Sequence, residues 1–423
     1  MERMQNNFTN TNSNLLKDTL LGTQFLFVAF GATVLVPLLI GIDPAVALFT
    51  AGVGTLIFHL ITKGKVPVFI GSSFAFIAPI VESTKLYGYA GTLSGLIAVG
   101  LVYGIASALV KGYGQKIIER FFPAVVVGPV IMVIGLSLAP VAIDMAKSNW
   151  IVAIASLATA IFAVVYGKGI LKLIPIFVGI IVGYFTAFGL GIVDFTPLKE
   201  AAWFSFPALT APEFNYHAIL YMIPVAFAPL IEHIGDMYAI SAVAKKDFVK
   251  EPGLHRTMLG DGVATAVAGF LGGPPNTTYS EVTGAISLTK ITNPRILRIS
   301  AIVAVLFSLI GKVSGLLKTI PTSVLGGIMI LLFGMITSVG IKTLVESHTD
   351  FNKTRNQVII SVILTIGIGG AAISFGNFSL SGIGLASLVG IVLNLILPKH
   401  SEPLPEKEEL EKIDALEEEG IEQ

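Results

Sequence analysis

Residues 66–80 read VPVFIGSSFAFIAPI, and residues 274–281 read PPNTTYSE. Both stretches interrupt a sequence that is otherwise almost continuously apolar, and each is too short or too polar for an ordinary membrane-spanning helix. Proline ends helices, and unpaired backbone groups are tolerated at membrane depth only where they line a cavity. Two broken segments at equivalent places in the two halves of a chain indicate the binding site of a transporter.

The composition around these segments is that of a membrane protein. Of 423 residues, 54% are hydrophobic and 13% are charged, whereas a soluble chain carries about 25% charged residues. The net charge is zero, so nothing indicates a nucleic-acid partner. The chain has no Cys, its six His show no metal-like spacing, and it has no phosphate-binding loop. We therefore expect no cofactor, no resident metal and no direct use of ATP.

The apolar runs predict the number of membrane spans. A hydrocarbon core about 30 Å thick needs about 20 apolar residues per helix, and such runs predict about 14 spans. The clearest are 22–40, 44–62, 89–110, 123–142, 150–166, 170–193, 219–244, 297–317, 321–339, 356–373 and 380–397. Three more, 66–80, 254–271 and 277–288, are short or broken.

The distribution of positive charge predicts the orientation. If the spans alternate, 22 of the 27 Lys and Arg residues lie on the side of the N-terminus, and five lie on the other side: Lys85, Lys147, Lys199, Lys312 and Lys318. Positively charged loops resist translocation. We therefore expect a multi-pass protein of the cell inner (plasma) membrane with both termini in the cytoplasm.

Two similar octapeptides predict an internal repeat. Residues 122–129 read FPAVVVGP and residues 320–327 read IPTSVLGG, so that Pro, Val and Gly recur in register. Elements seven spans apart cross the membrane in opposite directions. The sequence therefore predicts two halves of seven spans related by an axis in the membrane plane.

Four carboxylates fall inside or at the edge of apolar runs: Glu232, Asp236, Asp261 and Glu281. A charge at mid-bilayer costs at least about 2.5 kcal/mol, so such residues usually face a cavity and have a function. Glu232 and Asp236 are four residues apart and share one helical face, where two like charges favour reversible protonation of one of them. Asp261 is interpreted as satisfying backbone groups near the cytoplasmic side, and His233 as a packing residue.

These groups suit a flat heterocycle such as uracil, which presents alternating N–H donors and C=O acceptors. A carboxylate accepts from a ring N–H, and backbone N–H groups near Ser280 and Glu281 can donate to the ring carbonyls. An aromatic side chain such as Phe74 or Tyr279 can stack on the ring face.

Several motifs resemble one known family. They are FGATVLVP at 30–37, GSSFAF at 71–76, EHIG at 232–235, PGLHR at 252–256, and PNTTY at 275–279 followed by Glu281. From about Phe25 to Pro398 the chain resembles the nucleobase–ascorbate transporter family, and within it the bacterial uracil permeases.

The resemblance implies an all-α polytopic fold of 14 spans as a 7+7 inverted repeat, with short strands in spans 3 and 10. It also implies a core domain and a gate domain, the latter usually mediating homodimerisation. The expected boundaries are a cytoplasmic segment 1–20, core 21–116, gate 117–215, core 216–318, gate 319–398 and an acidic cytoplasmic tail 399–423. By position, the expected substrate-binding residues are Glu232, Glu281, Phe74, Tyr279, Ser280, Ala32 and Ser73.

The chain also departs from the uracil permease pattern. Asp236 stands where His is typical, an acidic choice seen among purine-transporting relatives; Ser280 replaces a common Gly, and Val282 a usual Asn. We expect proton-coupled import of uracil by alternating access, with Asp236 or Glu232 taking the proton. A xanthine or other purine permease, coupled to protons or sodium, is the alternative. An anion exchanger or channel of the same fold is a second alternative. We do not expect the protein to be an enzyme.

Overall fold

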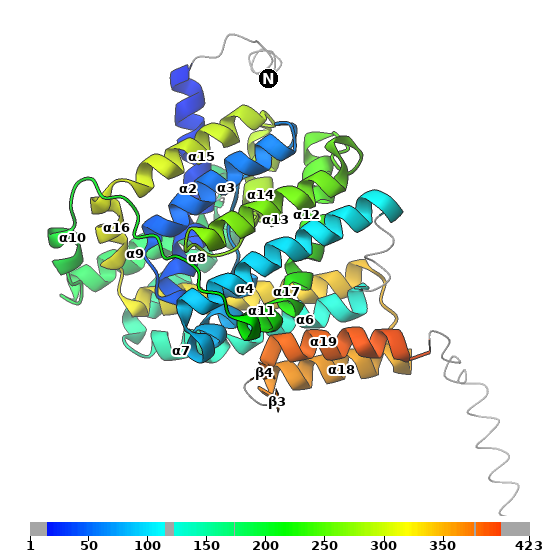
Figure 1. Cartoon of the computed structure of the whole chain (residues 1–423). Coiled ribbons are helices and arrows are strands. Elements are labelled where there is room, and N and C mark those ends of the chain that lie inside the picture. The colour runs from blue at the N-terminus through cyan, green and yellow to red at the C-terminus, as the bar shows by residue number, and fades with distance from the viewer. Residues whose placement is uncertain (1–14, 115–121, 173, 376–377, 399–423) are drawn as a thin grey trace, which may run out of the picture.

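The computed structural model describes residues 15–114, 122–172, 174–375 and 378–398, and these are mostly helical (Figure 1). The segment expected at 1–20 lies largely outside the described residues, and the tail expected at 399–423 lies wholly outside them. The helices of the first half are α2 (Leu15–Ile40), α3 (Pro44–Ile61), α4 (Ile77–Tyr113), α6 (Ala124–Ser137), α7 (Ala139–Ala146), α8 (Trp150–Tyr166), α9 (Pro175–Gly189) and α10 (Thr196–Glu200).

The second half contains α11 (Tyr216–Met222), α12 (Phe227–Ala244), α13 (Leu254–Phe270), α14 (Ser280–Thr289), α15 (Pro294–Ser308), α16 (Gly311–Lys318), α17 (Thr322–Glu346), α18 (Thr354–Ile368) and α19 (Gly382–Ile396). Single turns are η1 (Phe74–Phe76), η2 (Gly169–Lys172), η3 (Pro224–Ala226) and η4 (Val249–Gly253). The strands are β1 (Ile70–Ser72), β2 (Asn276–Thr278), β3 (Ala372–Phe375) and β4 (Phe378–Ser381).

Within the described ranges, six helical stretches are long and apolar enough to cross a membrane, and four further apolar helices are shorter. The predicted ranges 44–62 and 150–166 agree with α3 and α8 to within a residue. Other boundaries differ. Range 297–317 is broken between α15 and α16, and the predicted start of the last span at residue 380 lies in strand β4.

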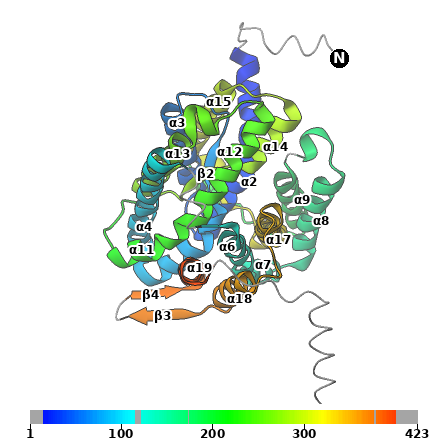
Figure 2. The same cartoon turned by 90° about the vertical axis from the view of Figure 1, so that its right-hand side faces the viewer.

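The helices form two groups by their mutual contacts, seen side by side in Figure 2. In the first, which we call the α13 group, α13 packs against α3 and α4, α15 packs against α2 and α3, and α11 packs against α4; α14 packs against α2 and α12, and α12 also contacts α13. In the second, the α17 group, α17 packs against α6, α7, α8 and α9, while α18 and α19 pack on each other and on α6. Both groups bury mainly aliphatic side chains.

Strands β1 and β2 cross inside the α13 group. They pair antiparallel, with Ile70 opposite Thr278, Gly71 opposite Thr277 and Ser72 opposite Asn276. The crossing is tight at Gly71, because a Cβ atom there would lie 2.7 Å from Tyr279 Oη and 3.1 Å from Thr33 Oγ1. Glycine at this position is therefore a packing requirement.

The carboxylate of Asp43, which lies between α2 and α3, links α3 to α16. Asp43 caps α3 by accepting from Ala45 N at 2.8 Å, and it also accepts from Ser314 Oγ at 2.5 Å and from Lys318 Nζ at 2.7 Å. Partial burial raises the pKa of Asp43, but the three hydrogen bonds outweigh that effect, and the pKa lies below its ordinary value of 3.8.

Replacing Gly71 with Ala should destabilise the protein by about 1–3 kcal/mol, because the added methyl group overlaps the Tyr279 hydroxyl. Thermal unfolding of purified protein in detergent measures the effect. Gly104→Ala on α4 is the control, since no heavy atom lies within 4 Å of its added Cβ. Equal melting temperatures for the two variants would contradict the packing argument.

Asp43→Asn should remove one source of acid sensitivity. A carboxylate with a lowered pKa stabilises the folded state above its ordinary pKa, and that stability is lost as pH falls through the lowered pKa. Asn still caps a helix, so the variant should lose only the ion pair, worth up to about 1 kcal/mol. The melting temperatures of wild type and variant should differ at neutral pH and converge below about pH 4. A difference that is constant with pH would contradict this assignment.

Candidate functional site

The backbone of strand β1 is satisfied by side chains of α3. Thr55 Oγ1 donates to Ile70 O and accepts from Ile70 N, both at 3.0 Å, and His59 Nε2 donates to Val68 O at 3.0 Å. On the other edge, Ser73 N donates to Pro275 O at 2.9 Å, which extends the pairing with β2. An extended segment can therefore lie between helices without water.

Strand β2 is held in the same way. Thr265 Oγ1 donates to Asn276 O at 2.9 Å, and the Asn276 side-chain amide donates to Thr50 O at 3.0 Å. Tyr279 Oη donates to Ser72 O at 3.0 Å, so the Tyr279 side chain fastens β1 to the end of β2. The Tyr279 hydroxyl is thus engaged within the protein.

A helix follows each strand. β1 leads through η1 into α4, and β2 leads directly into α14, whose first residue is Ser280. Tyr279 precedes α14 without a side-chain cap. The first backbone N–H groups of a helix have no intrahelical acceptor, so the start of α14 offers free donors.

The strand ends and these helix starts border a cavity of about 320 Å³, within the range of small-molecule sites. One wall is polar and comes from the α13 group; its residues are Ser72, Ser73, Phe74, Ala75, Ala228, Pro229, Glu232, Thr277, Thr278, Tyr279, Ser280 and Glu281. The opposite wall is apolar and comes from α6 and α17; its residues are Ile131, Ile134, Leu332, Met335, Ile336 and Val339.

Six of the expected substrate-binding residues line this cavity: Ser73, Phe74, Glu232, Tyr279, Ser280 and Glu281. The seventh, Ala32, is buried in α2 and is not among the lining residues. Ser280 and Glu281 lie deep among the helices, yet their side chains are accessible to water because they open onto the cavity. The two glutamates predicted to converge therefore face one space.

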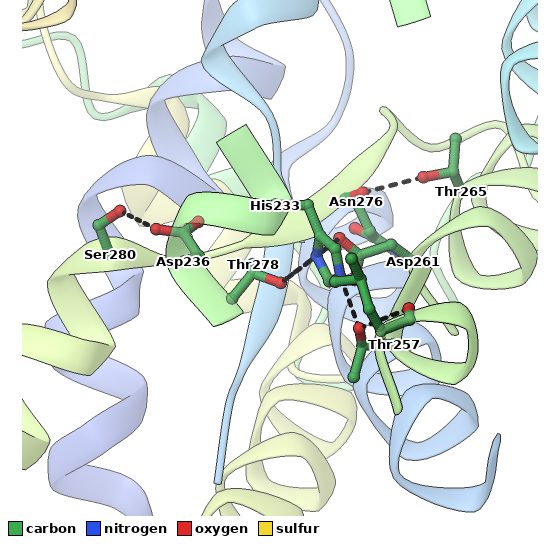
Figure 3. A network of polar contacts seen from close by, with 9 residues as sticks. His233, Asp236, Thr257, Asp261, Thr265, Asn276, Thr278 and Ser280 are labelled. Carbon is green, nitrogen blue, oxygen red and sulfur yellow. Dashed lines mark hydrogen bonds and ion pairs between the residues drawn. The ribbon is translucent and has the colours of Figure 1, made fainter. Parts of the chain in front are cut away.

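Asp236 lies behind the cavity wall, is 7% exposed and does not line the cavity. Its Oδ1 accepts a hydrogen bond from Ser280 Oγ at 2.7 Å (Figure 3). Its Oδ2 is buried and has no hydrogen-bond partner in the described part of the chain. Two of the positions at which the sequence departs from the uracil permease pattern are therefore partners in one hydrogen bond.

Asp261 has a different role from the one expected. Its carboxylate is fully buried, and its Oδ2 lies 2.8 Å from His233 Nδ1, so it pairs with an imidazole rather than with backbone (Figure 3). His233 Nδ1 also lies 3.1 Å from Thr278 Oγ1, and His233 Nε2 lies 2.9 Å from Thr257 Oγ1. The network joins α12, α13 and β2, and no feature of the sequence around Asp261 indicated His233 as its partner.

The hydrogen bonds fix the charge of this pair. Thr257 donates its hydroxyl proton to Leu254 O at 2.9 Å, so its oxygen accepts from His233 Nε2–H. One further proton lies between His233 Nδ1 and Asp261 Oδ2. The imidazole and the carboxyl group then hold two protons together and carry no net charge, which makes their burial at this depth tolerable.

The apolar wall was not predicted. Its members on α17, Leu332, Ile336 and Val339, have the three- and four-residue spacing of one helical face. That spacing is common to every helix that packs, so it did not distinguish a cavity wall from an ordinary core.

Comparisons with known proteins identify a family and several relatives. A model of a permease family matches residues 16–375. The chain is 52% identical to a probable uracil permease of Haemophilus influenzae over 397 residues, covering 92% of this chain and 96% of the relative. It is 45% identical to the uracil permease of Bacillus caldolyticus over 394 residues, covering 89% of this chain and 91% of the relative.

Two solved structures have a similar fold. The transmembrane domain of the cyanobacterial bicarbonate transporter BicA matches with a TM-score of 0.64 and 15% identity, over 90% of this chain and 97% of that one. The structure of SLC26A9 matches with a TM-score of 0.65 and 12% identity, over 90% of this chain and 65% of that one. At these identities the similarity concerns the fold alone.

Removing one partner of the His233–Asp261 pair should be strongly destabilising. Asp261→Ala or His233→Ala leaves a buried polar group unpaired, at a cost of about 3–5 kcal/mol. The double variant should lose less than the sum of the two, as a double-mutant cycle by denaturant or thermal unfolding would show. As a control, Asp261→Ala is combined with Ser156→Ala on α8 of the α17 group, and the two losses of stability should add. Additivity in both combinations would contradict direct pairing.

Proposed function

The chain belongs to the permease family, which is the nucleobase–ascorbate transporter family that its motifs resemble, and on that premise we propose that it imports a nucleobase, with uracil as the first candidate. It is a multi-pass membrane protein and a transporter rather than an enzyme. One observation carries the proposal: Glu232 and Glu281 open onto a single cavity beside the unwound backbone of β1 and β2.

The polar wall complements a flat heterocycle. Glu232 and Glu281 accept hydrogen bonds from the two ring N–H groups, and the free N–H groups at the start of α14 donate to a ring carbonyl. Phe74 stacks on one ring face, and the apolar wall covers the rest. Ser73, which follows β1, adds a polar contact, and Ala32 of α2 contributes by packing.

The import cycle is proton symport by alternating access. The α13 group carries the polar wall and the α17 group carries the apolar wall, so movement of one past the other exposes the cavity to each side of the membrane in turn. Asp236, buried behind the cavity wall, takes the coupled proton, with Glu232 as the other candidate. The acidic residue at position 236 also favours xanthine or another purine as an alternative cargo.

We also propose an inverted repeat, a core and a gate domain, a dimer and a membrane orientation for this chain. Antiparallel pairing of β1 and β2, and Pro123 and Pro321 preceding α6 and α17 in similar conformations, support an inverted repeat of seven and seven spans. The α13 group corresponds to the core domain (21–116 and 216–318), and the α17 group to the gate domain (117–215 and 319–398), through which two copies dimerise. The protein lies in the inner membrane with both termini cytoplasmic.

An anion exchanger or channel of similar fold is the weaker candidate. Anion sites carry cationic groups, and the described residues that line this cavity include two glutamates and neither Lys nor Arg. A carboxylate-lined space favours a ligand that donates hydrogen bonds.

Uptake of labelled uracil into proteoliposomes should follow an imposed pH gradient and persist when choline replaces sodium. Glu281→Gln should weaken binding about 10- to 100-fold, because a hydrogen bond to a charged group contributes about 1.5–3 kcal/mol. Its melting temperature serves as the folding control. Accumulation that ignores the pH gradient would exclude proton coupling, and displacement of uracil by unlabelled xanthine would favour a purine carrier.

A further inference from the structure

The hydroxyl of Ser280 stands between a buried carboxyl group and the cavity. Ser280 lines the cavity as the first residue of α14, and its Oγ lies 2.7 Å from Asp236 Oδ1 on α12. Asp236 itself does not line the cavity. The Ser280 hydroxyl is therefore a group of the cavity lining that is hydrogen-bonded directly to Asp236.

A serine hydroxyl has one proton to donate and lone pairs with which to accept. When Asp236 is ionised, both of its oxygens only accept, so the Ser280 hydroxyl must donate to Oδ1. The separation of 2.7 Å is that of a direct hydrogen bond between the two side chains. In this state Ser280 presents only a lone pair to the cavity.

Protonation of Asp236 reverses this bond. Asp236 Oδ2 has no partner in the described part of the chain, so a proton placed there would be a buried donor without an acceptor. A proton on Oδ1 instead donates to Ser280 Oγ. The Ser280 hydroxyl proton is then free to turn into the cavity.

We propose that Ser280 is the coupling residue that converts the protonation state of Asp236 into a hydrogen-bond donor for the cargo. The inference rests on the proposed function. A proton from water on the outer side binds the Asp236 carboxylate, Ser280 then donates to a ring carbonyl, and the cargo binds more tightly. On the inner side the cargo leaves, and the same proton returns to water as Asp236 ionises.

The acidic groups around Asp236 favour the uptake of one proton. Glu232 on the same helix, Glu281 on α14 and Asp261 on α13 all interact electrostatically with Asp236, and Tyr103 on α4 faces the same cluster. Asp261 is already neutralised by His233. Asp236, Glu232 and Glu281 form no ion pair among the residues that the structure describes, so uptake of one proton relieves repulsion among them.

The first test compares the pH dependence of uracil KM in proteoliposomes for wild type, Ser280→Ala and Ser280→Thr. Ser280→Ala should raise KM about 2- to 10-fold at the acidic end, where the donor bond is lost, and should flatten the pH profile. Ser280→Thr keeps a hydroxyl and should retain the profile. Ser287→Ala, two turns along α14 and away from the cavity lining, is the matched control. A Ser280→Ala profile that follows wild type at every pH would overturn the proposal.

A second measurement does not depend on transport. The infrared carbonyl stretch of protonated Asp236, identified by its disappearance in Asp236→Asn, should shift in Ser280→Ala because the acid loses its acceptor. An unmoved band would overturn the coupling role. If the band shifts but wild type carries no nucleobase, the coupling between Ser280 and Asp236 is supported and the proposed cargo is wrong. If wild type carries uracil and the band does not shift, the proposed cargo is correct and the coupling role of Ser280 is wrong.

Discussion

The structure depends on one constraint: the backbone of two crossing strands must find all of its hydrogen bonds in a region without water. Thr55 bonds one edge of β1 and His59 bonds the backbone two residues before it, the strands bond each other, Thr265 bonds β2, and the Tyr279 hydroxyl donates to Ser72 O of β1. An unpaired backbone group at this depth costs several kcal/mol. With the strands held in this way, α14 begins beside the cavity, and Ser280 and Glu281 at its start line it.

The same region concentrates acidic groups that the fold treats differently. Asp261 is neutralised by His233 within a closed network, so it serves structure. Glu232 and Glu281 open onto the cavity, and one oxygen of Asp236 has no hydrogen-bond partner among the described residues. Burying a carboxylate without a cationic partner costs free energy, and proteins retain such a carboxylate where protonation can remove its charge. Environment, more than residue type, separates the structural carboxylate from those available to a ligand or a proton.

Much of this could be predicted from sequence, because the bilayer makes helix length and polarity strong signals. Ranges 44–62 and 150–166 and the broken segments around Gly71 and Thr277 were identified from hydropathy and proline alone. The break at Gly88 within α4, with φ of 73°, also lies where the predicted segments separate. The last two residues of β4, 380 and 381, were predicted to lie in a membrane span, since a short apolar run has no decisive period.

Pairings between distant residues could not be predicted in this way. Asp261 was interpreted from its nearest neighbours in sequence, whereas its partner His233 lies 28 positions earlier on another helix. The Ser280–Asp236 bond spans 44 positions for the same reason. Periodicity reports which face of one helix is polar. It does not report which helix that face meets.

Hydrogen bonds hold two surfaces in one register, because each bond must break before the surfaces can slip. The aliphatic side chains on α6 and α17 that border the cavity have neither donors nor acceptors, and each contact between carbon atoms is worth only about 0.1–0.2 kcal/mol. Such contacts carry no hydrogen bond that must break before the surfaces move. If the two groups move past each other as proposed, a polar substitution on this surface would add an interaction that must break in each cycle, and it would also change the contact between the apolar wall and the cargo.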